Sequence, residues 1–183
     1  MQIKRVKSFL ALAVLFAVAG LAQARAAQPA ADGRTPDLPP GPCDLVQVPE
    51  GNKVTFHAYA SGVQVYSWNG TAWVFVEPVA NLFADRNYHG QVGTHYAGPT
   101  WESNSGSRVV ARRLTGCTPN ASAIPWLKLE TVTSEGPGIF DGVTFVQRVN
   151  TTGGTAPAAP GSFVGEESRV PYTAEYFFYR AAN

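Results

Sequence analysis

The chain has 183 residues, of which 45% are hydrophobic, and its 14 Lys and Arg against 13 Asp and Glu give a formal net charge of +1. This length fits one domain that can bury a core of its own, which excludes a multidomain assembly. A nearly neutral chain lacks the strongly basic face that displaces counterions from phosphates, so no nucleic-acid partner is expected.

Residues 1–26 are predicted to be a signal peptide. Basic residues at positions 4, 5 and 7 precede an apolar run over 9–22, and two A-x-A patterns allow cleavage after residue 24 or 26. As a helix, this run is too short to cross a hydrocarbon core of about 30 Å. We therefore expect a secreted or periplasmic protein with no transmembrane segment after signal cleavage.

The segment after the signal peptide, residues 27–46, is predicted to be a flexible leader. It is rich in Pro and Ala and has few large apolar side chains to bury. Residues 47–183 are then predicted to form a single all-β domain.

A β-hairpin is the strongest local prediction in this domain. Apolar and polar residues alternate over 53–60 and again over 62–68, as in half-buried strands. Asn69-Gly70 follows directly and precedes another β-type segment, 71–76. Because both central residues of a type I′ turn need positive φ, this dipeptide predicts a hairpin over 62–76.

The rest of the domain is predicted to be mainly β-strands. Segment 77–85 is the exception, because Pro78 and the spacing of Val79, Leu82 and Phe83 favour a short helix. The expected strands are 90–96, 107–114, 126–133, 143–149 and 170–179. Seven or eight short strands favour an antiparallel β-sandwich or barrel with short helical turns.

Several catalytic and cofactor motifs are missing from the sequence. It contains no G-x-S-x-G, H-E-x-x-H or C-x-x-C, and Gly136-Pro137-Gly138 is followed by Asp141 where a dinucleotide loop needs its third glycine. No cofactor is therefore expected. Cys43 and Cys117 are the two cysteines of the chain, and in an exported protein a disulfide between them is favoured over two free thiols.

Strings along most of the mature chain carry a family resemblance. They include GVQVY at 62–66, GTHYAGPTWE at 93–102, GSRV at 106–109, IPWL at 124–127, QRVNT at 147–151 and VPYTA at 170–174. Because of these strings, the chain from Val48 to Arg180 resembles domain of unknown function 3455, a family of secreted bacterial and fungal proteins. The family has no settled activity, so the resemblance assigns no catalytic residue. The malate-dehydrogenase label of some fungal members does not fit a chain without a nicotinamide-binding loop.

The resemblance also bears on the cysteines. Many bacterial members carry one cysteine two places after the Val-Gln-x-Tyr string and another after an Ala-Pro segment. This chain has Trp68 at the first place and Gly161-Ser162 at the second. The joint loss implies that those family cysteines pair with each other and that Cys43 with Cys117 is a substitute bridge.

A candidate cleft lies between Asp85 and Glu102. We predict that His95, Tyr96, Trp101 and Glu102 line it, because the Gly98-Pro99 turn can bring the two halves of the segment together. The opposing interpretation is that these polar groups serve backbone hydrogen bonds and that Trp101 plugs one end of the sheet.

Two catalytic arrangements involve the same segment. His57, His95 and Glu102 are a possible metal site with nitrogen and oxygen ligands. Alternatively, His95 acts as a base for Ser105 or Ser107.

A binding surface is the remaining candidate. Gln64, Tyr66 and Trp68 combine aromatic rings with an amide, as sites for sugars or aromatic envelope ligands do, and Trp101 is a further surface candidate. Four other aromatic residues are assigned to the core: Trp73, Trp126, Phe145 and Phe177.

The favoured function is thus a binding or cell-envelope-associated module with an envelope or extracellular ligand, for which carbohydrate is one candidate. The alternative is a metal-dependent or His/carboxylate hydrolase with its site around His95 and Glu102.

Overall fold

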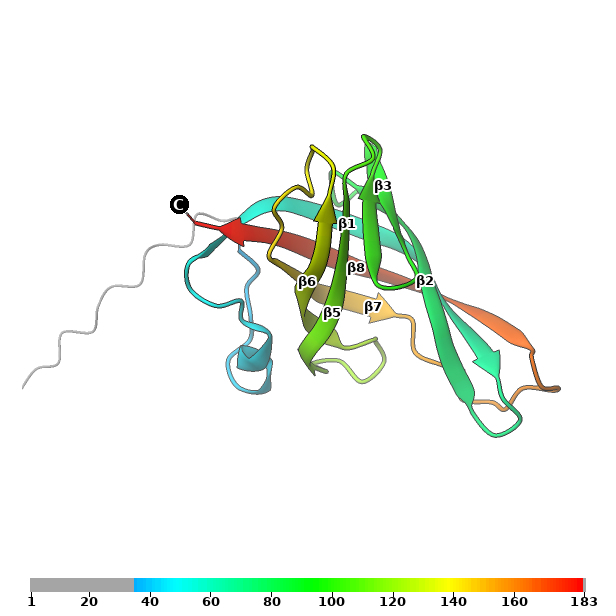
Figure 1. The fold of residues 1–183 in the computed structure, drawn as a ribbon. Helices are drawn as coiled ribbons and strands as arrows, with labels where there is room; N and C mark the ends of the chain where they lie inside the picture. The colour runs from blue at the N-terminus through cyan, green and yellow to red at the C-terminus, as the bar shows by residue number, and fades with distance from the viewer. Residues whose placement is uncertain (1–34, 183) are drawn as a thin grey trace, which may run out of the picture. The chain divides into compact units, whose positions relative to one another are not determined.

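A closed barrel of eight antiparallel strands forms the described part of the chain (Figure 1). The computed structural model describes residues 35–182, so the predicted signal peptide and the first part of the predicted leader lie outside the described residues. The strands are β1 (Asn52–Trp68), β2 (Trp73–Phe83), β3 (Gln91–Tyr96), β4 (Thr100–Ser103), β5 (Arg108–Cys117), β6 (Trp126–Glu135), β7 (Phe145–Gly153) and β8 (Glu167–Ala181). The helical element preceding them is the 3-10 helix η1 (Pro42–Val46).

Each strand pairs with the next one along the chain, and β1 closes the ring by pairing with β8 from Asn52↔Ala181 to Ser67↔Glu167. The all-β prediction is confirmed, with a barrel in place of the alternative sandwich. The predicted strands 53–60 and 62–68 are one long strand, β1, and β4 was not predicted. Among the described residues, no helix combines the length and the hydropathy needed to cross a bilayer.

The helix predicted over 77–85 is wrong, because most of this segment belongs to β2. Ala80 and Leu82 are buried while Val79 and Asn81 are exposed, which is the period of a strand. Pro78 is tolerated because β3 pairs with β2 from Ala80 onwards, so the proline lies where β2 has a strand neighbour on one side. Pairing with β1 therefore outweighs the local helix signal.

The predicted hairpin is confirmed as β1–β2, although its turn is of another type. Trp68 pairs with Trp73 across a four-residue loop, and Gly70 has a φ of 96° whereas Asn69 is not at positive φ. The Asn69 side chain organises the loop, since its Oδ1 accepts hydrogen bonds from the backbone N–H groups of Thr71 (2.9 Å) and Ala72 (2.8 Å). The loop is therefore not the two-residue type I′ turn.

Gly70→Val is expected to lower the melting temperature by a few degrees, which corresponds to about 1–2 kcal/mol. A side chain at this φ is strained, and a Cβ there would lie 3.2 Å from Val164 Cγ2. Thr71→Val in the same exposed loop is the matched control, with an expected shift near zero. Thermal unfolding followed by circular dichroism measures both, and equal melting temperatures for the two variants would contradict the role of Gly70.

The barrel interior holds the larger core. Along β8 the side chains of Tyr172, Ala174, Tyr176 and Phe178 belong to this inner cluster, whereas Phe177 and Tyr179 belong to a second cluster. Successive side chains of a strand point to opposite faces, so the second cluster lies on the outer face of the barrel wall.

The outer cluster is covered by an N-terminal strap, residues 42–48. Cys43, Val46 and Val48 are buried there, and a disulfide joins Cys43 to Cys117 at the end of β5. The predicted bridge is confirmed. Hydrogen bonds also fasten the strap, from Gln147 Nε2 to Val46 O (2.7 Å) and from Thr115 Oγ1 to Leu45 O (2.6 Å). The last residues assigned to the flexible leader, 42–46, are thus packed against the barrel.

Candidate ligand-binding pocket

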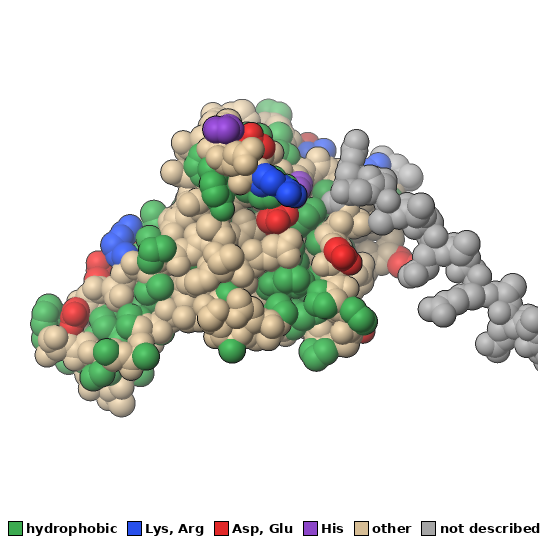
Figure 2. Space-filling view, turned by 180° about the vertical axis from the view of Figure 1, so that it is seen from behind, with side chains coloured by type: hydrophobic (Ala, Val, Ile, Leu, Met, Phe, Trp, Pro, Cys, Tyr) green, Lys and Arg blue, Asp and Glu red, His purple; other side chains and the backbone are tan. Residues whose placement is uncertain are grey.

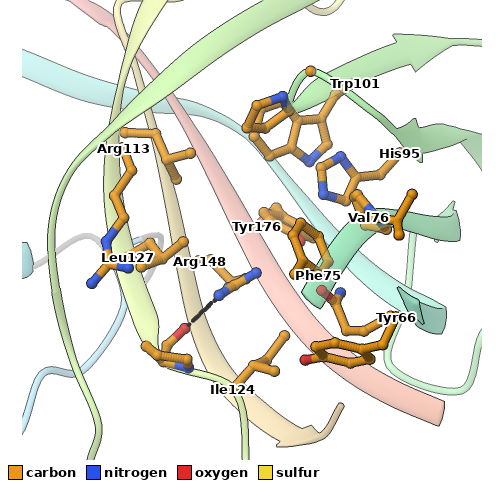
Figure 3. A pocket seen from close by; sticks show the side chains of 16 residues that line it. Tyr66, Phe75, Val76, His95, Trp101, Arg113, Ile124, Leu127, Arg148 and Tyr176 are labelled. Atoms are coloured by element: carbon orange, nitrogen blue, oxygen red, sulfur yellow. Dashed lines mark hydrogen bonds between the residues drawn. The ribbon is translucent and has the colours of Figure 1, made fainter. Parts of the chain in front are cut away.

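A pocket of about 430 Å³ enters the barrel interior (Figure 3). Its wall is mainly apolar and aromatic. The side chains of this kind include Tyr66, Phe75, Val76, Trp101, Ile124, Leu127, Leu129 and Tyr176. Both the volume and the composition are typical of sites for small molecules.

β2 and the β3–β4 turn line one side of the pocket, and Arg113 of β5 and Leu127 of β6 lie across from them (Figure 3). Phe75, Val76 and Pro78 line it from the part of β2 that precedes the pairing with β3, and Gly98 and Pro99 line it from the turn. Phe75 and Val76 are 49% and 50% exposed. Exposed apolar side chains continue from this rim over the end of the β1–β2 hairpin and the loop before β8, where Figure 2 shows hydrophobic side chains gathered; they include Val74, Phe163 and Val164.

His95 and Trp101 form one side of the pocket. They are opposite each other on β3 and β4, and their rings stack at 4.4 Å with an interplanar angle of 7°. The ring of Tyr176 packs edge-on against both rings, with centroid distances of 5.1 Å to His95 and 5.3 Å to Trp101. Trp101 is only 1% exposed, so the prediction that it lies on the surface is wrong, although it does line the pocket.

The buried imidazole of His95 is neutral at neutral pH. Burial lowers its pKa to about 3, although its bond to Thr100 opposes the shift. Nδ1 lies 2.8 Å from Thr100 O, and since a carbonyl oxygen only accepts, Nδ1 carries the proton and donates it. A pKa of about 3 makes His95 a weak general base near neutral pH.

The structure divides the predicted cleft between the two faces of the β3–β4 hairpin. Tyr96 and Glu102 do not line the pocket, and the Tyr96 hydroxyl donates to Glu102 Oε2 at 2.5 Å. His95 and Trp101 line the pocket. Neighbouring residues of a strand face opposite ways, so one cleft cannot collect all four side chains.

The proposed metal ligands also separate. His57 Nε2 donates to Glu175 Oε2 at 2.8 Å, and this bond is the main cause that lowers the pKa of the Glu175 carboxyl. His95 instead bonds to Thr100, and Glu102 to Tyr96. Within residues 35–182, no group of three or more His, Cys, Asp or Glu side chains is placed to hold a metal ion.

Ser105 and Ser107, the candidate nucleophiles, are hydrogen-bonded within a serine cluster and not to His95. Ser103 Oγ lies within hydrogen-bond distance of Ser105 Oγ (2.9 Å) and Ser107 Oγ (2.8 Å). Ser107 Oγ also accepts a bond from Phe140 N. The cluster organises the β4–β5 turn, and the hydrogen bonds of its serines do not include His95.

Gln64 and Tyr66, predicted as surface ligand-binding residues, are buried in the pocket wall. The Tyr66 hydroxyl donates to Gly154 O at 2.7 Å, and burial raises its pKa. Trp68 is outside the pocket, and its ring centroid lies 5.4 Å from that of Trp73. Of the four aromatic residues assigned to the core, Trp126 and Phe177 are buried, and Trp73 and Phe145 are half-buried.

Arg148 is one of the pocket residues that sequence reasoning missed. It is half-buried, extends toward Tyr176 in Figure 3, and donates from Nε (3.1 Å) and Nη2 (2.9 Å) to Pro125 O. A signal was present, since alternation within the predicted strand 143–149 places Arg148 on the same face as the inner residue Val146.

A family model described as "Protein of unknown function (DUF3455)" matches residues 49–180. The chain belongs to the DUF3455 family. The DUF3455 match covers all eight strands almost entirely and therefore the pocket, while Cys43 lies before it. No match was found among curated proteins or among solved structures.

Trp68 and Gly161, at the two places where the resemblance implies cysteines in many bacterial members, are neighbours in this barrel. A Cβ built on Gly161 would lie 2.7 Å from Trp68 Cβ, so the indole occupies the space beside the glycine. In this DUF3455 domain the bridge is elsewhere, between the strap and β5.

Proposed function

We propose that the protein is an exported binding module that holds a small apolar or aromatic molecule in the barrel pocket. The observation that carries this proposal is the pocket itself, with a volume of about 430 Å³ and a mainly apolar wall. An eight-stranded barrel is just wide enough either to be filled by side chains or to hold one small ligand.

The lining favours an apolar ring or chain over a sugar. A sugar carries many hydroxyls, and each needs a hydrogen-bond partner when it leaves water. The surface of this wall is mainly apolar, and Gln64 is its one amide. Carbohydrate, the earlier candidate, is therefore less favoured here.

The disulfide supports a location outside the cytoplasm, because such bridges persist in oxidising compartments. A secreted or periplasmic location remains part of the proposal, together with a ligand from the envelope or the extracellular medium. The hydrolase alternative gains no support, because His95 is bonded to a backbone carbonyl and Glu102 to Tyr96.

Titration with the neutral dye N-phenyl-1-naphthylamine tests the proposal. We expect saturable binding, seen as increased dye fluorescence. Val76→Asp places a charge at the half-exposed rim and should weaken binding several-fold, while Val132→Asp should not, because Val132 is exposed on β6 away from the pocket. Absence of saturable binding, or equal weakening by both changes, would contradict a pocket ligand.

A further inference from the structure

The guanidinium of Arg148 lacks a counter-ion in the described part of the protein. Arg108 and Arg112 on β5 are paired with Glu135 and Glu130, whereas no carboxylate oxygen of residues 35–182 lies within 4.0 Å of Arg148. Its described partner is a neutral carbonyl, Pro125 O. A half-buried charge without an opposite charge is costly, and an anion that enters the pocket removes part of that cost.

Other polar atoms of the pocket residues point to the same class of ligand. Gln64 Nε2, Trp101 Nε1 and the Tyr176 hydroxyl are buried without a partner in good hydrogen-bond geometry among the described residues, although the side chains of Tyr172 and Arg148 lie close enough to Tyr176 to lower its pKa against the effect of burial. An amide N–H₂ and an indole N–H only donate. A ligand atom that reached this amide or indole after a small side-chain movement would therefore be a hydrogen-bond acceptor.

The charge balance of the lining agrees with an anionic ligand. Arg148 and the exposed Arg113 line the pocket, and the lining residues include no Asp or Glu. The charge of Arg148 also acts across the pocket: burial raises the pKa of Tyr66 and of Tyr176, and Arg148 opposes both shifts.

We propose that the ligand is a small carboxylic acid whose carboxylate binds Arg148 and whose apolar ring or chain packs against the aromatic wall. This inference rests on the proposed function and names the class of its ligand. The two bonds to Pro125 O leave three of the five guanidinium N–H donors for the carboxylate.

Calorimetric titration with a matched pair of probes, 4-phenylbutyrate and 4-phenylbutan-1-ol, tests this inference on the mature protein. Hydrogen bonds to charged groups predict that the acid binds about 10-fold to 100-fold more tightly than the alcohol. Arg148→Met should reduce the affinity for the acid to that for the alcohol and leave the alcohol unchanged. Arg112→Met, an exposed arginine outside the pocket, should change neither affinity.

The outcomes separate the inference from the proposed function. Equal binding of the two probes to the wild type would overturn the carboxylate and leave the apolar pocket standing, whereas binding of neither probe would overturn both. A preference for the acid that survives in Arg148→Met would overturn the role of Arg148. If that variant does not fold, Arg148→Lys decides: it should weaken the acid several-fold and not the alcohol, and an unchanged ratio overturns the assignment.

Discussion

Replacing Trp101 with alanine is expected to lower the free energy of unfolding by about 3–5 kcal/mol. The indole is almost fully buried and packs against His95, Tyr176 and Phe178 inside the barrel. Its removal leaves a cavity that the surrounding strands cannot fill, because their positions are fixed by the closed ring. Urea unfolding followed by circular dichroism measures the change.

Trp68→Ala is the matched control for this prediction. Trp68 is half-buried, lies outside the barrel cavity and has Trp73 as its aromatic neighbour. Its loss should cost clearly less than the loss of Trp101. Equal costs for the two variants would show that burial inside the barrel does not set the stability at position 101.

Removing the disulfide through Cys43→Ser together with Cys117→Ser is expected to cost about 4 kcal/mol. The two residues are separated by 74 positions, and constraining a loop of that length lowers the entropy of the unfolded chain accordingly. The strap would also lose its covalent tie to β5. Urea unfolding of the double variant measures the cost, and intact mass with and without reduction and alkylation verifies the bridge.

Thr115→Val separates the contribution of one strap hydrogen bond to stability from the contribution of the disulfide. It removes the hydrogen bond to Leu45 O and keeps the disulfide, so the free energy of unfolding is expected to fall by about 1 kcal/mol. The disulfide prediction would be contradicted by two thiols that react freely in the native oxidised protein, or by a Cys43→Ser and Cys117→Ser double variant as stable as the parent.

The hydrophobic pattern of the sequence predicted most strands because alternation is a local property. Phe56, Ala58 and Ala60 alternate within one segment and share the inner face, which is readable without knowing the partner strand; Val54, which the same alternation placed with them, packs against the outer cluster because the register shifts between Val54 and Phe56. Pro78 shows the limit. Its tolerance in β2 depends on where β3 begins to pair, which is a tertiary fact.

The site was harder to predict than the fold. The predicted cleft grouped His95 and Trp101, which line the pocket, with Tyr96 and Glu102, although alternation places neighbouring residues on opposite faces. Arg148 was missed for another reason. A strand pattern shows which residues share a face, but a charged residue on the inner face gains meaning only once the ring closes around an unfilled space.

The pairing of β1 with β8 has a consequence for how the protein is made. Asn52 pairs with Ala181, so β1 cannot complete its pairing until the last strand of the chain, β8, is available. Until residues 167–181 arrive, β1 and β7 are open sheet edges and the aromatic residues of β8 are missing from the interior. Such edges recruit other strands, and contacts between distant residues form slowly. A chain that ends before residue 167 lacks β8, so it cannot close the ring and keeps both edges open.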